Sequence, residues 1–272
     1  MKNNILTRQV CMLFVCLLLS FSAISSEQTS IAAPKSGIAY ASAQIRALQA
    51  DDTANPGMLW VANGETFWNE PAGSQAKSCA QCHSAASTGT PAPTAPPMNG
   101  AATHYPQFDA ATKSLVNLEG RINQCRVKHQ GAAPLAYESD ALLGLTAFVA
   151  YQSRGLPRRI TIDESNRVAF EQGAALYRQR MGQMNLACVH CHVQNAGKTL
   201  LAENISEGHS NGYPIYRLEW QNVGSLHRRL RSCQLGVRAE PFAPGSDQYL
   251  ALELYLAWRA GGLPIETPAV RR

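Results

Sequence analysis

The stretch that decides the fold reads Cys188-Val189-His190-Cys191-His192, and an earlier stretch, Cys79-Ala80-Gln81-Cys82-His83, repeats its pattern. Each is a Cys-x-x-Cys-His haem attachment signal. In such a signal the two thiols form thioethers to the haem vinyl groups, and the adjacent histidine supplies one axial ligand to the iron. The sequence therefore predicts two covalently bound c-type haems, held by the pairs Cys79/Cys82 and Cys188/Cys191, with His83 and His192 as iron ligands.

Zinc is the other metal that paired Cys-x-x-Cys motifs bind. In zinc ribbons the two pairs usually stand about 15–20 residues apart. Here the pairs begin at Cys79 and Cys188, more than a hundred residues apart, and each is followed directly by histidine. We therefore discount a zinc site.

The two motifs belong to an internal repeat that covers most of the chain. In each copy a glycine stands 15 positions before the first haem cysteine, and a later segment ends in a further cysteine. The matching segments are Gly64–Cys79 with Gly173–Cys188, Leu118–Cys125 with Leu226–Cys233, and 139–157 with 246–264. We expect two copies of one structural unit.

The last segment of each copy predicts a helix. Apolar residues recur there at helical spacing, after a serine N-cap (Ser139 or Ser246) and before a glycine and a proline. With a helix before each haem motif, the pattern resembles the class I cytochrome c fold. We predict a mainly α protein of two tandem class I cytochrome c-like domains related by the internal repeat, after a cleaved signal peptide.

The expected organisation has four parts. Residues 1–25 form the signal peptide, 26–56 an N-terminal extension, 57–158 domain 1 with haem 1, and 159–272 domain 2 with haem 2 and the active site. Residues 154–165, with a proline and a basic pair, form the expected linker. A Pro-, Ala- and Thr-rich loop is expected from 85 to 98.

The start of the chain indicates export. Lys2 and Arg8 precede an apolar run from Val10 to Phe21, and small residues follow it. The run is shorter than the about 20 residues that a membrane-spanning helix needs, so cleavage is favoured over a retained anchor. Covalent c-type haem attachment takes place outside the bacterial inner membrane. We therefore expect a periplasmic protein with no membrane span after signal cleavage.

The charge balance excludes one class of partner. The formal net charge is +5 at pH 7, and removal of Lys2 and Arg8 leaves +3. The propionates of two haems bring the total near neutral. This balance implies no nucleic-acid partner.

Two cysteines remain after the signal and the haem motifs are counted. The chain has 8 cysteines, of which Cys11 and Cys16 lie in the predicted signal and four attach haem. Cys125 and Cys233 are left, and in an oxidising compartment two spare thiols usually form a disulfide. That alternative stays open from the count alone.

The repeat favours a different role for these two thiols, as distal iron ligands. Cys125 stands 42 positions after His83, and Cys233 stands 41 after His192. Electron-carrier cytochromes often use methionine instead, but no methionine follows residue 184. The other candidates are Met98, His104 and His129 in the first copy and His209 and His227 in the second. Only the cysteines recur at matched places, so we predict His/Cys ligation in both domains, which stabilises Fe(III).

Arginines surround Cys233. They are Arg228, Arg229, Arg231 and Arg238, with Arg217 further back. In the first copy Arg121 aligns with Arg229, but Glu119, Ile122 and Asn123 replace much of the remaining charge. Such a run is most often a solvated face or a clamp for haem propionates. Guanidinium groups also bind oxyanions through paired N–H donors, and beside a nucleophilic sulfur they indicate an anionic sulfur substrate.

The segment from Tyr213 to Cys233 resembles the SoxA family, the catalytic cytochromes of thiosulfate oxidation, and the resemblance extends over residues 57 to 265. Because Cys79, Cys82, His83 and Cys125 are all present, the chain resembles the dihaem type. The resemblance implies an L-cysteine S-thiosulfotransferase. Such an enzyme couples thiosulfate oxidatively to a cysteine of a SoxYZ-like carrier protein, forming a cysteine S-thiosulfonate.

The resemblance also implies partners and residue roles. Electrons would pass through haem to an electron-accepting cytochrome c, with a SoxX-like monohaem cytochrome c as the partner subunit. Cys233 would be catalytic and carry an extra sulfur as a persulfide, Arg229 would bind the substrate, and Cys125 would be a ligand only.

Three alternatives are weighed against this assignment. A plain dihaem electron carrier explains the haems but neither the absent methionine ligands nor the arginines. A dihaem thiosulfate dehydrogenase, which forms free tetrathionate, also uses a His/Cys haem. A dihaem peroxidase needs one open iron, which two matched cysteine ligands disfavour.

Overall fold

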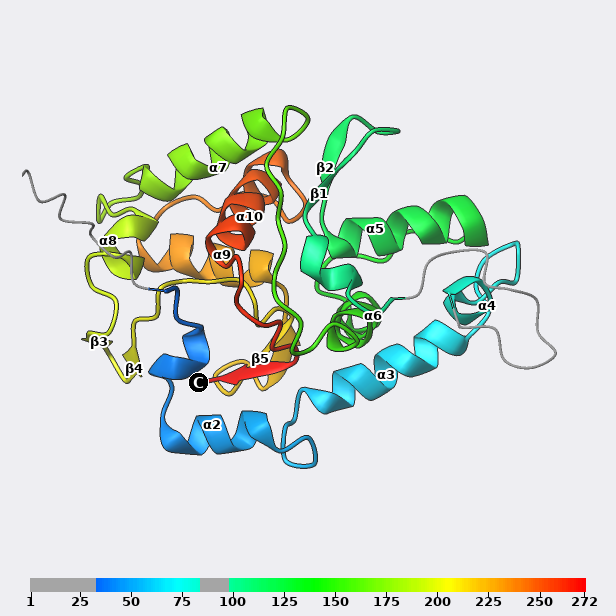
Figure 1. The fold of residues 1–272 in the computed structure, drawn as a ribbon, viewed down its shortest axis with the longest axis horizontal. Coiled ribbons are helices and arrows are strands. Elements are labelled where there is room, and N and C mark those ends of the chain that lie inside the picture. The colour runs from blue at the N-terminus through cyan, green and yellow to red at the C-terminus, as the bar shows by residue number, and fades with distance from the viewer. Residues whose placement is uncertain (1–32, 84–97) are drawn as a thin grey trace, which may run out of the picture. The chain divides into compact units, whose positions relative to one another are not determined.

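The computed structural model describes residues 33–83 and 98–272 (Figure 1). The predicted signal peptide, residues 1–25, lies outside the described residues, as do the first part of the predicted extension and all but the last residue of the Pro-rich loop. Residues 34–272 form one compact unit. No helix of the described residues is long and apolar enough to cross a membrane.

The internal repeat is visible in the order of the elements. Each half has a long helix, a short helix that carries the haem motif, a two-stranded hairpin, a helix that bears the spare cysteine, and a final helix (Figure 1). In the first half these are α3 (Met58–Asn69), α4 (Cys79–His83), β1 (Gln107–Asp109), β2 (Ser114–Val116), α5 (Leu118–Cys125) and α6 (Asp140–Tyr151). In the second they are α7 (Arg167–Arg178), α8 (Cys188–His192), β5 (Ile215–Arg217), β6 (Asn222–Gly224), α9 (Leu226–Gly236) and α10 (Asp247–Arg259).

Shorter elements complete the described chain. The first half adds the 3-10 turn η2 (Ala101–His104) and the π-helical turn η3 (Arg126–Gln130). The second half adds a small hairpin of β3 (Thr199–Leu200) and β4 (Glu203–Asn204).

Two glycines set the helix crossings in the two halves. A Cβ placed on Gly64 of α3 would lie 2.0 Å from the carbonyl oxygen of Gly144 in α6. A Cβ on Gly173 of α7 would lie 2.0 Å from the carbonyl oxygen of Ala251 in α10. Because any side chain would overlap the facing backbone, glycine is what allows each pair of helices to pack so closely. The glycines that match in the sequence thus have matching structural roles.

The predicted caps of the final helices are confirmed. The Ser139 hydroxyl accepts a hydrogen bond from a backbone N–H in the first turn of α6, and Ser246 does the same for α10. Gly155 and Gly262 both have a φ of +82°. They lie four and three residues past the ends of α6 and α10, so they reverse the chain after each helix has ended rather than capping it directly.

The expected linker, residues 154–165, is a packed segment at its start. The N–H of Gly155 donates to the carbonyl of Ile265 at 2.9 Å, and the N–H of Arg158 donates to that of Leu263 at 2.8 Å. The Arg158 side chain is buried. The segments that follow α6 and α10 therefore hold each other through backbone hydrogen bonds.

The N-terminal extension is tied to the second half. β5 is the central strand of a three-stranded sheet, antiparallel to β6 and parallel to β7 (Ala269–Arg271). The extension forms η1 (Gly37–Tyr40) and α2 (Ala43–Ala50). Ile45 of α2 belongs to the same buried cluster as Tyr216 and Val270, so residues of the extension complete a core begun by the C-terminal strand.

Candidate functional site

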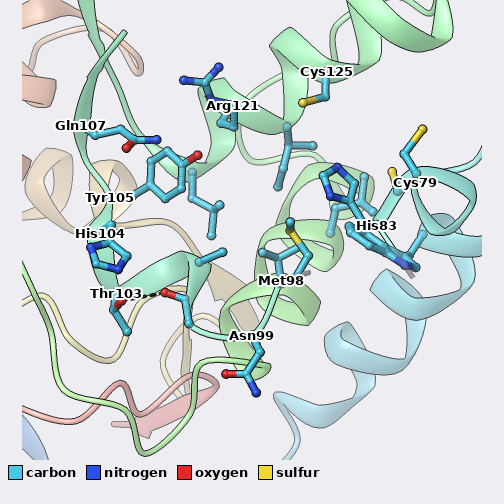
Figure 2. Close-up of a pocket in the computed structure, with 18 of the residues that line it drawn as sticks. Cys79, His83, Met98, Asn99, Thr103, His104, Tyr105, Gln107, Arg121 and Cys125 are labelled. Carbon is cyan, nitrogen blue, oxygen red and sulfur yellow. Dashed lines mark hydrogen bonds between the residues drawn. The ribbon is translucent and has the colours of Figure 1, made fainter. Parts of the chain in front are cut away.

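The first half contains a cavity of about 950 Å³. Cys79, Cys82 and His83 of the motif helix line it, and so does Cys125 of α5 (Figure 2). Leucine and valine side chains of α5 and α6 form part of its walls. Its volume lies at the upper end of the about 300–1,000 Å³ that is usual for cofactor sites. An apolar cavity of this size, with two attachment thiols and an imidazole at one place, fits a covalently held haem.

The same cavity contains the rival candidates for the sixth ligand. Met98, His104 and His129 also line it (Figure 2 labels Met98 and His104). Met98 packs against the apolar cluster that includes Leu118 and Leu145. Cys125 as the distal ligand stays a prediction that rests on the repeat.

In the second half, His192 is held in a defined orientation. Its Nδ1 lies 2.8 Å from the carbonyl oxygen of Ser206. A Cβ on Gly208 would lie 2.8 Å from Cγ of His192, and Gly208 has a φ of +72°. When Nδ1 donates to a carbonyl, the tautomer is fixed and Nε2 is left to bind a metal. Residues 206–208 therefore hold the His192 ring in an orientation compatible with its predicted role as an iron ligand.

Cys233 faces His192 from the neighbouring helix α9. Its side chain is exposed to solvent. Packing around the sulfur would raise the pKa of the thiol, but a hydrogen bond with His192 and the positive charge of Arg229 hold that pKa below its usual value. The thiolate is the form that binds iron. One imidazole and one thiol whose pKa is lowered thus lie together, and both are donor groups that iron binds.

No disulfide joins Cys125 to Cys233 among the described residues. Neither of these two thiols is bonded to another cysteine there. The thiol of Cys125 interacts electrostatically with Cys82, whereas that of Cys233 interacts with Cys188 and Cys191. Each spare cysteine therefore belongs to the haem motif of its own half.

The two histidine candidates of the second half are engaged with carboxylates. Nε2 of the buried His227 lies 3.0 Å from Oε2 of Glu253, and its Nδ1 accepts the N–H of Gly245 at 3.0 Å. Nε2 of His209 lies 3.0 Å from Oε2 of Glu207. Cys233 is left as the ligand candidate of this half.

The arginines of the predicted cluster have different partners in the structure. Arg229 lies one helical turn before Cys233, on the same face of α9, and its charge acts on the thiol together with that of Arg217. Arg228 instead lies 4.0 Å from a carboxylate oxygen of Glu138. Arg238 lies 3.4 Å from the side-chain oxygen of Gln183. Arg229 and Arg217 are therefore the arginines positioned to act with the sulfur.

Sequence reasoning missed an acidic residue at this place. Oε1 of Glu219 lies 2.7 Å from Nε of Arg217 and 3.8 Å from a terminal nitrogen of Arg229. A comparison of charges at aligned hairpin positions would have drawn attention to it, because the first copy has Ala111 there.

Sequence reasoning also missed a buried polar cluster between the halves. Glu119 of α5 and Glu253 of α10 line a cavity of about 30 Å³ together with Arg158. Burial and the charge of Glu253 raise the pKa of Glu119 to about 7. Asn117 donates to Glu253 at 3.1 Å. Glu119 aligns with His227 in the repeat, so equivalent positions of the two copies meet at one cluster.

Known proteins resemble the chain over most of its length. The family model described as SoxA/TsdA, cytochrome c domain, matches residues 63–158 and again 172–265. The protein named L-cysteine S-thiosulfotransferase subunit SoxA of Pseudaminobacter salicylatoxidans is 40% identical over 87% of this chain and 80% of its own. The protein of that name from Rhodovulum sulfidophilum is 35% identical with the same coverage.

The structural comparison agrees with these matches. The crystal structure of SoxXA from P. pantotrophus has a TM-score of 0.81 at 33% identity, and the match covers 88% of this chain and 87% of that one. The predicted fold class, two tandem cytochrome c domains, is thereby confirmed, and the domains are of a haem-binding family.

Proposed function

The chain belongs to the SoxA family, and from that premise we propose that it is the catalytic dihaem subunit of an L-cysteine S-thiosulfotransferase. The observation that carries the proposal is the meeting of Cys233 with His192 and Arg229: a thiol whose pKa is held below its usual value, beside a motif histidine and an arginine one turn away. This arrangement provides both a sulfur nucleophile and an oxyanion contact.

Each half is proposed to hold one haem. Cys79 and Cys82 attach the first and Cys188 and Cys191 the second, with the iron ligands His83 and Cys125 in one half and His192 and Cys233 in the other. The cavity beside Cys79 supports the first assignment. The domain boundaries 57–158 and 159–272 are proposed with them, and both family matches fall within these limits.

In the proposed overall reaction two sulfur atoms are oxidised and become joined by a new S–S bond. Thiosulfate and the carrier thiol lose one proton and two electrons, and a bond forms between the sulfane sulfur and the carrier cysteine, giving the cysteine S-thiosulfonate. When bound, the haems supply one-electron acceptors for these electrons. The guanidinium of Arg229 binds and orients the sulfonate end through paired N–H donors.

Cys233 is proposed to act as the covalent relay. As a persulfide it forms a bond between its outer sulfur and the sulfane sulfur of thiosulfate, with loss of one proton and two electrons to the haem acceptors. The carrier thiol then attacks the sulfane sulfur and takes over the whole thiosulfate group as the S-thiosulfonate, while the Cys233 persulfide leaves with the thiol proton. Such an intermediate divides one difficult step into two.

The proposed partners follow from the family. They are a SoxX-like monohaem cytochrome c, a SoxYZ-like carrier protein and an electron-accepting cytochrome c, with thiosulfate as the small substrate. The match to a SoxXA crystal structure supports the first. The proposed location is the periplasm, because covalent haem attachment takes place there and a secreted carrier protein is present there.

A second candidate function is a thiosulfate dehydrogenase that releases tetrathionate, because the matching family model includes TsdA as well as SoxA. Product analysis separates the two. The holoprotein with its partner is mixed with thiosulfate, oxidised cytochrome c and the carrier protein. We expect a thiosulfonate adduct on the carrier cysteine by intact-mass measurement. Free tetrathionate with an unmodified carrier would favour the dehydrogenase, and cytochrome reduction without any sulfur product would indicate a plain electron carrier.

A further inference from the structure

In the hairpin of β5 and β6, the carboxylate of Glu219 lies beside Arg217 and Arg229, the two arginines that act on Cys233. Oε1 of Glu219 lies 2.7 Å from Nε of Arg217 and 3.8 Å from a terminal nitrogen of Arg229. The side chain of Glu219 is 48% exposed, whereas that of Arg217 is 5% exposed. One carboxylate oxygen of a half-exposed side chain therefore bridges a buried arginine and the proposed substrate arginine.

The other half of the repeat shows that this arrangement is specific to the second half. There the strand position aligned with Arg217 is occupied by Asp109, which lies 3.7 Å from Arg121, the counterpart of Arg229. An acid in the strand thus pairs with the arginine directly. In the second half the strand acid is replaced by an arginine, and the acid is moved to the turn, at Glu219.

The buried arginine has a second carboxylate. Nη2 of Arg217 lies 3.2 and 3.1 Å from the two carboxylate oxygens of Glu203. If Glu219 swings out, Arg217 keeps this partner, so no buried charge is left uncompensated. The ion pair of Glu219 with Arg229 is long and solvated, and pairs of this kind contribute only about 0.2–1 kcal/mol. Loss of the contact between Glu219 and Arg229 to an incoming anion therefore costs little free energy.

We propose that Glu219 is an internal competitor of the substrate, which occupies Arg229 until a sulfur oxyanion displaces it, with Arg217 as the positioning residue that holds Glu219 in place. This inference rests on the proposed function. An anion has to replace a carboxylate, so a single negative charge gains little by the exchange. A dianion such as thiosulfate is attracted about twice as strongly at equal distance. Glu219 thereby weakens the binding of every anion at Arg229, and monovalent anions such as chloride, which start from a weaker attraction, are left with little occupancy.

The test uses the oxidised holoprotein with its partner subunit and compares Glu219→Gln with the wild type. We expect the KM for thiosulfate to fall about two- to five-fold, the range that corresponds to one solvated ion pair, with kcat unchanged. Competitive inhibition by chloride is expected to strengthen by a similar factor. Glu219→Asp, which keeps the charge, is expected to retain chloride resistance. Glu240→Gln removes the same charge from another exposed side chain of the same half and serves as the matched control for net charge.

A binding measurement distinguishes failure of this inference from failure of the proposed function. Calorimetric titration with sulfate, an unreactive dianion, is expected to show two- to five-fold tighter binding to Glu219→Gln than to the wild type, and it needs no turnover. Unchanged or weaker sulfate binding, or a KM that rises, would overturn the role of Glu219. A wild type that binds sulfate but transfers no sulfur would overturn the proposed function alone.

Discussion

Gly173→Ala is expected to destabilise the second half by forcing apart the two helices that cross there. In the native structure the added methyl would lie 2.0 Å from the carbonyl oxygen and 2.6 Å from the carbonyl carbon of Ala251, and 2.9 Å from Cβ of Tyr255. Ordinary contact begins near 3.4 Å, so α7 and α10 have to separate by more than 1 Å. The contacts are to backbone, which no change of rotamer relieves.

The size of the effect follows from opposing contributions. Alanine in a helix is favoured over glycine by about 1 kcal/mol. Against this, overpacking of a tight core costs about 1–3 kcal/mol or more, and a gap of 0.5–1 Å already loses a quarter to a half of each dispersion contact. The buried cluster of Tyr177, Leu252 and Leu256 lies along this crossing. We expect a net loss of about 1–3 kcal/mol and a fall of several degrees in Tm.

Thermal unfolding of the oxidised holoprotein measures this loss. Gly64→Ala meets the same 2.0 Å contact in the first half and is expected to cost a similar amount. Gly236→Ala is the matched control, because a Cβ there has no atom within 4 Å, and we expect it to leave Tm unchanged or slightly raised. A Gly173→Ala protein as stable as Gly236→Ala would show that the helices separate without cost, and the reasoning on the crossing would be wrong.

Three further changes have defined outcomes. Arg229→Ala removes a charge-assisted contact of about 1.5–3 kcal/mol, so kcat/KM for thiosulfate is expected to fall about 10- to 150-fold while the haem spectrum stays intact. The control is Arg231→Ala, at an exposed arginine of the same helix, which is expected to change neither kcat/KM nor the spectrum. Equal losses of kcat/KM in the two variants would show that net charge alone is responsible. Cys125→Ala is expected to alter the axial-ligand spectrum of one haem while sulfur transfer continues; an unaltered spectrum would favour Met98 or a histidine as the ligand. Glu119 has a pKa of about 7 in the folded protein against 4.5 for the ordinary side chain, so the stability that its protonated form contributes is fully present below about pH 4.5 and is lost as pH rises through 7. Denaturant unfolding of Glu119→Gln between pH 5 and 8 is expected to show a weaker decline than the wild type, and parallel curves would exclude Glu119 as the titrating group.

The features that sequence predicted well are those with a local or repeated signal. The haem motifs, the glycines of the helix crossings and the serine caps each occur twice at matched spacing, and each copy restricts the interpretation of the other. The same logic selected Cys125 and Cys233 over the scattered histidines. This choice stays a prediction, although His227 and His209 of the second half are both engaged with carboxylates.

What sequence did not predict depends on contacts between distant segments. Ile45 packs with Val270, and Asn55 donates to the carbonyl of Pro268 at 2.9 Å, across more than two hundred residues. No periodicity within the extension encodes such pairings. Glu219 was missed for a related reason: its importance arises from Arg217 and Arg229, which lie on other elements and meet it only in the folded hairpin.

The most direct test of the central claim is peptide-resolved mass spectrometry of the mature, non-reduced holoprotein after turnover with thiosulfate. The account predicts haem on both Cys-x-x-Cys pairs and an additional sulfur on Cys233, with none on Cys125. A disulfide between Cys125 and Cys233, or sulfur carried by Cys125 instead, would contradict it.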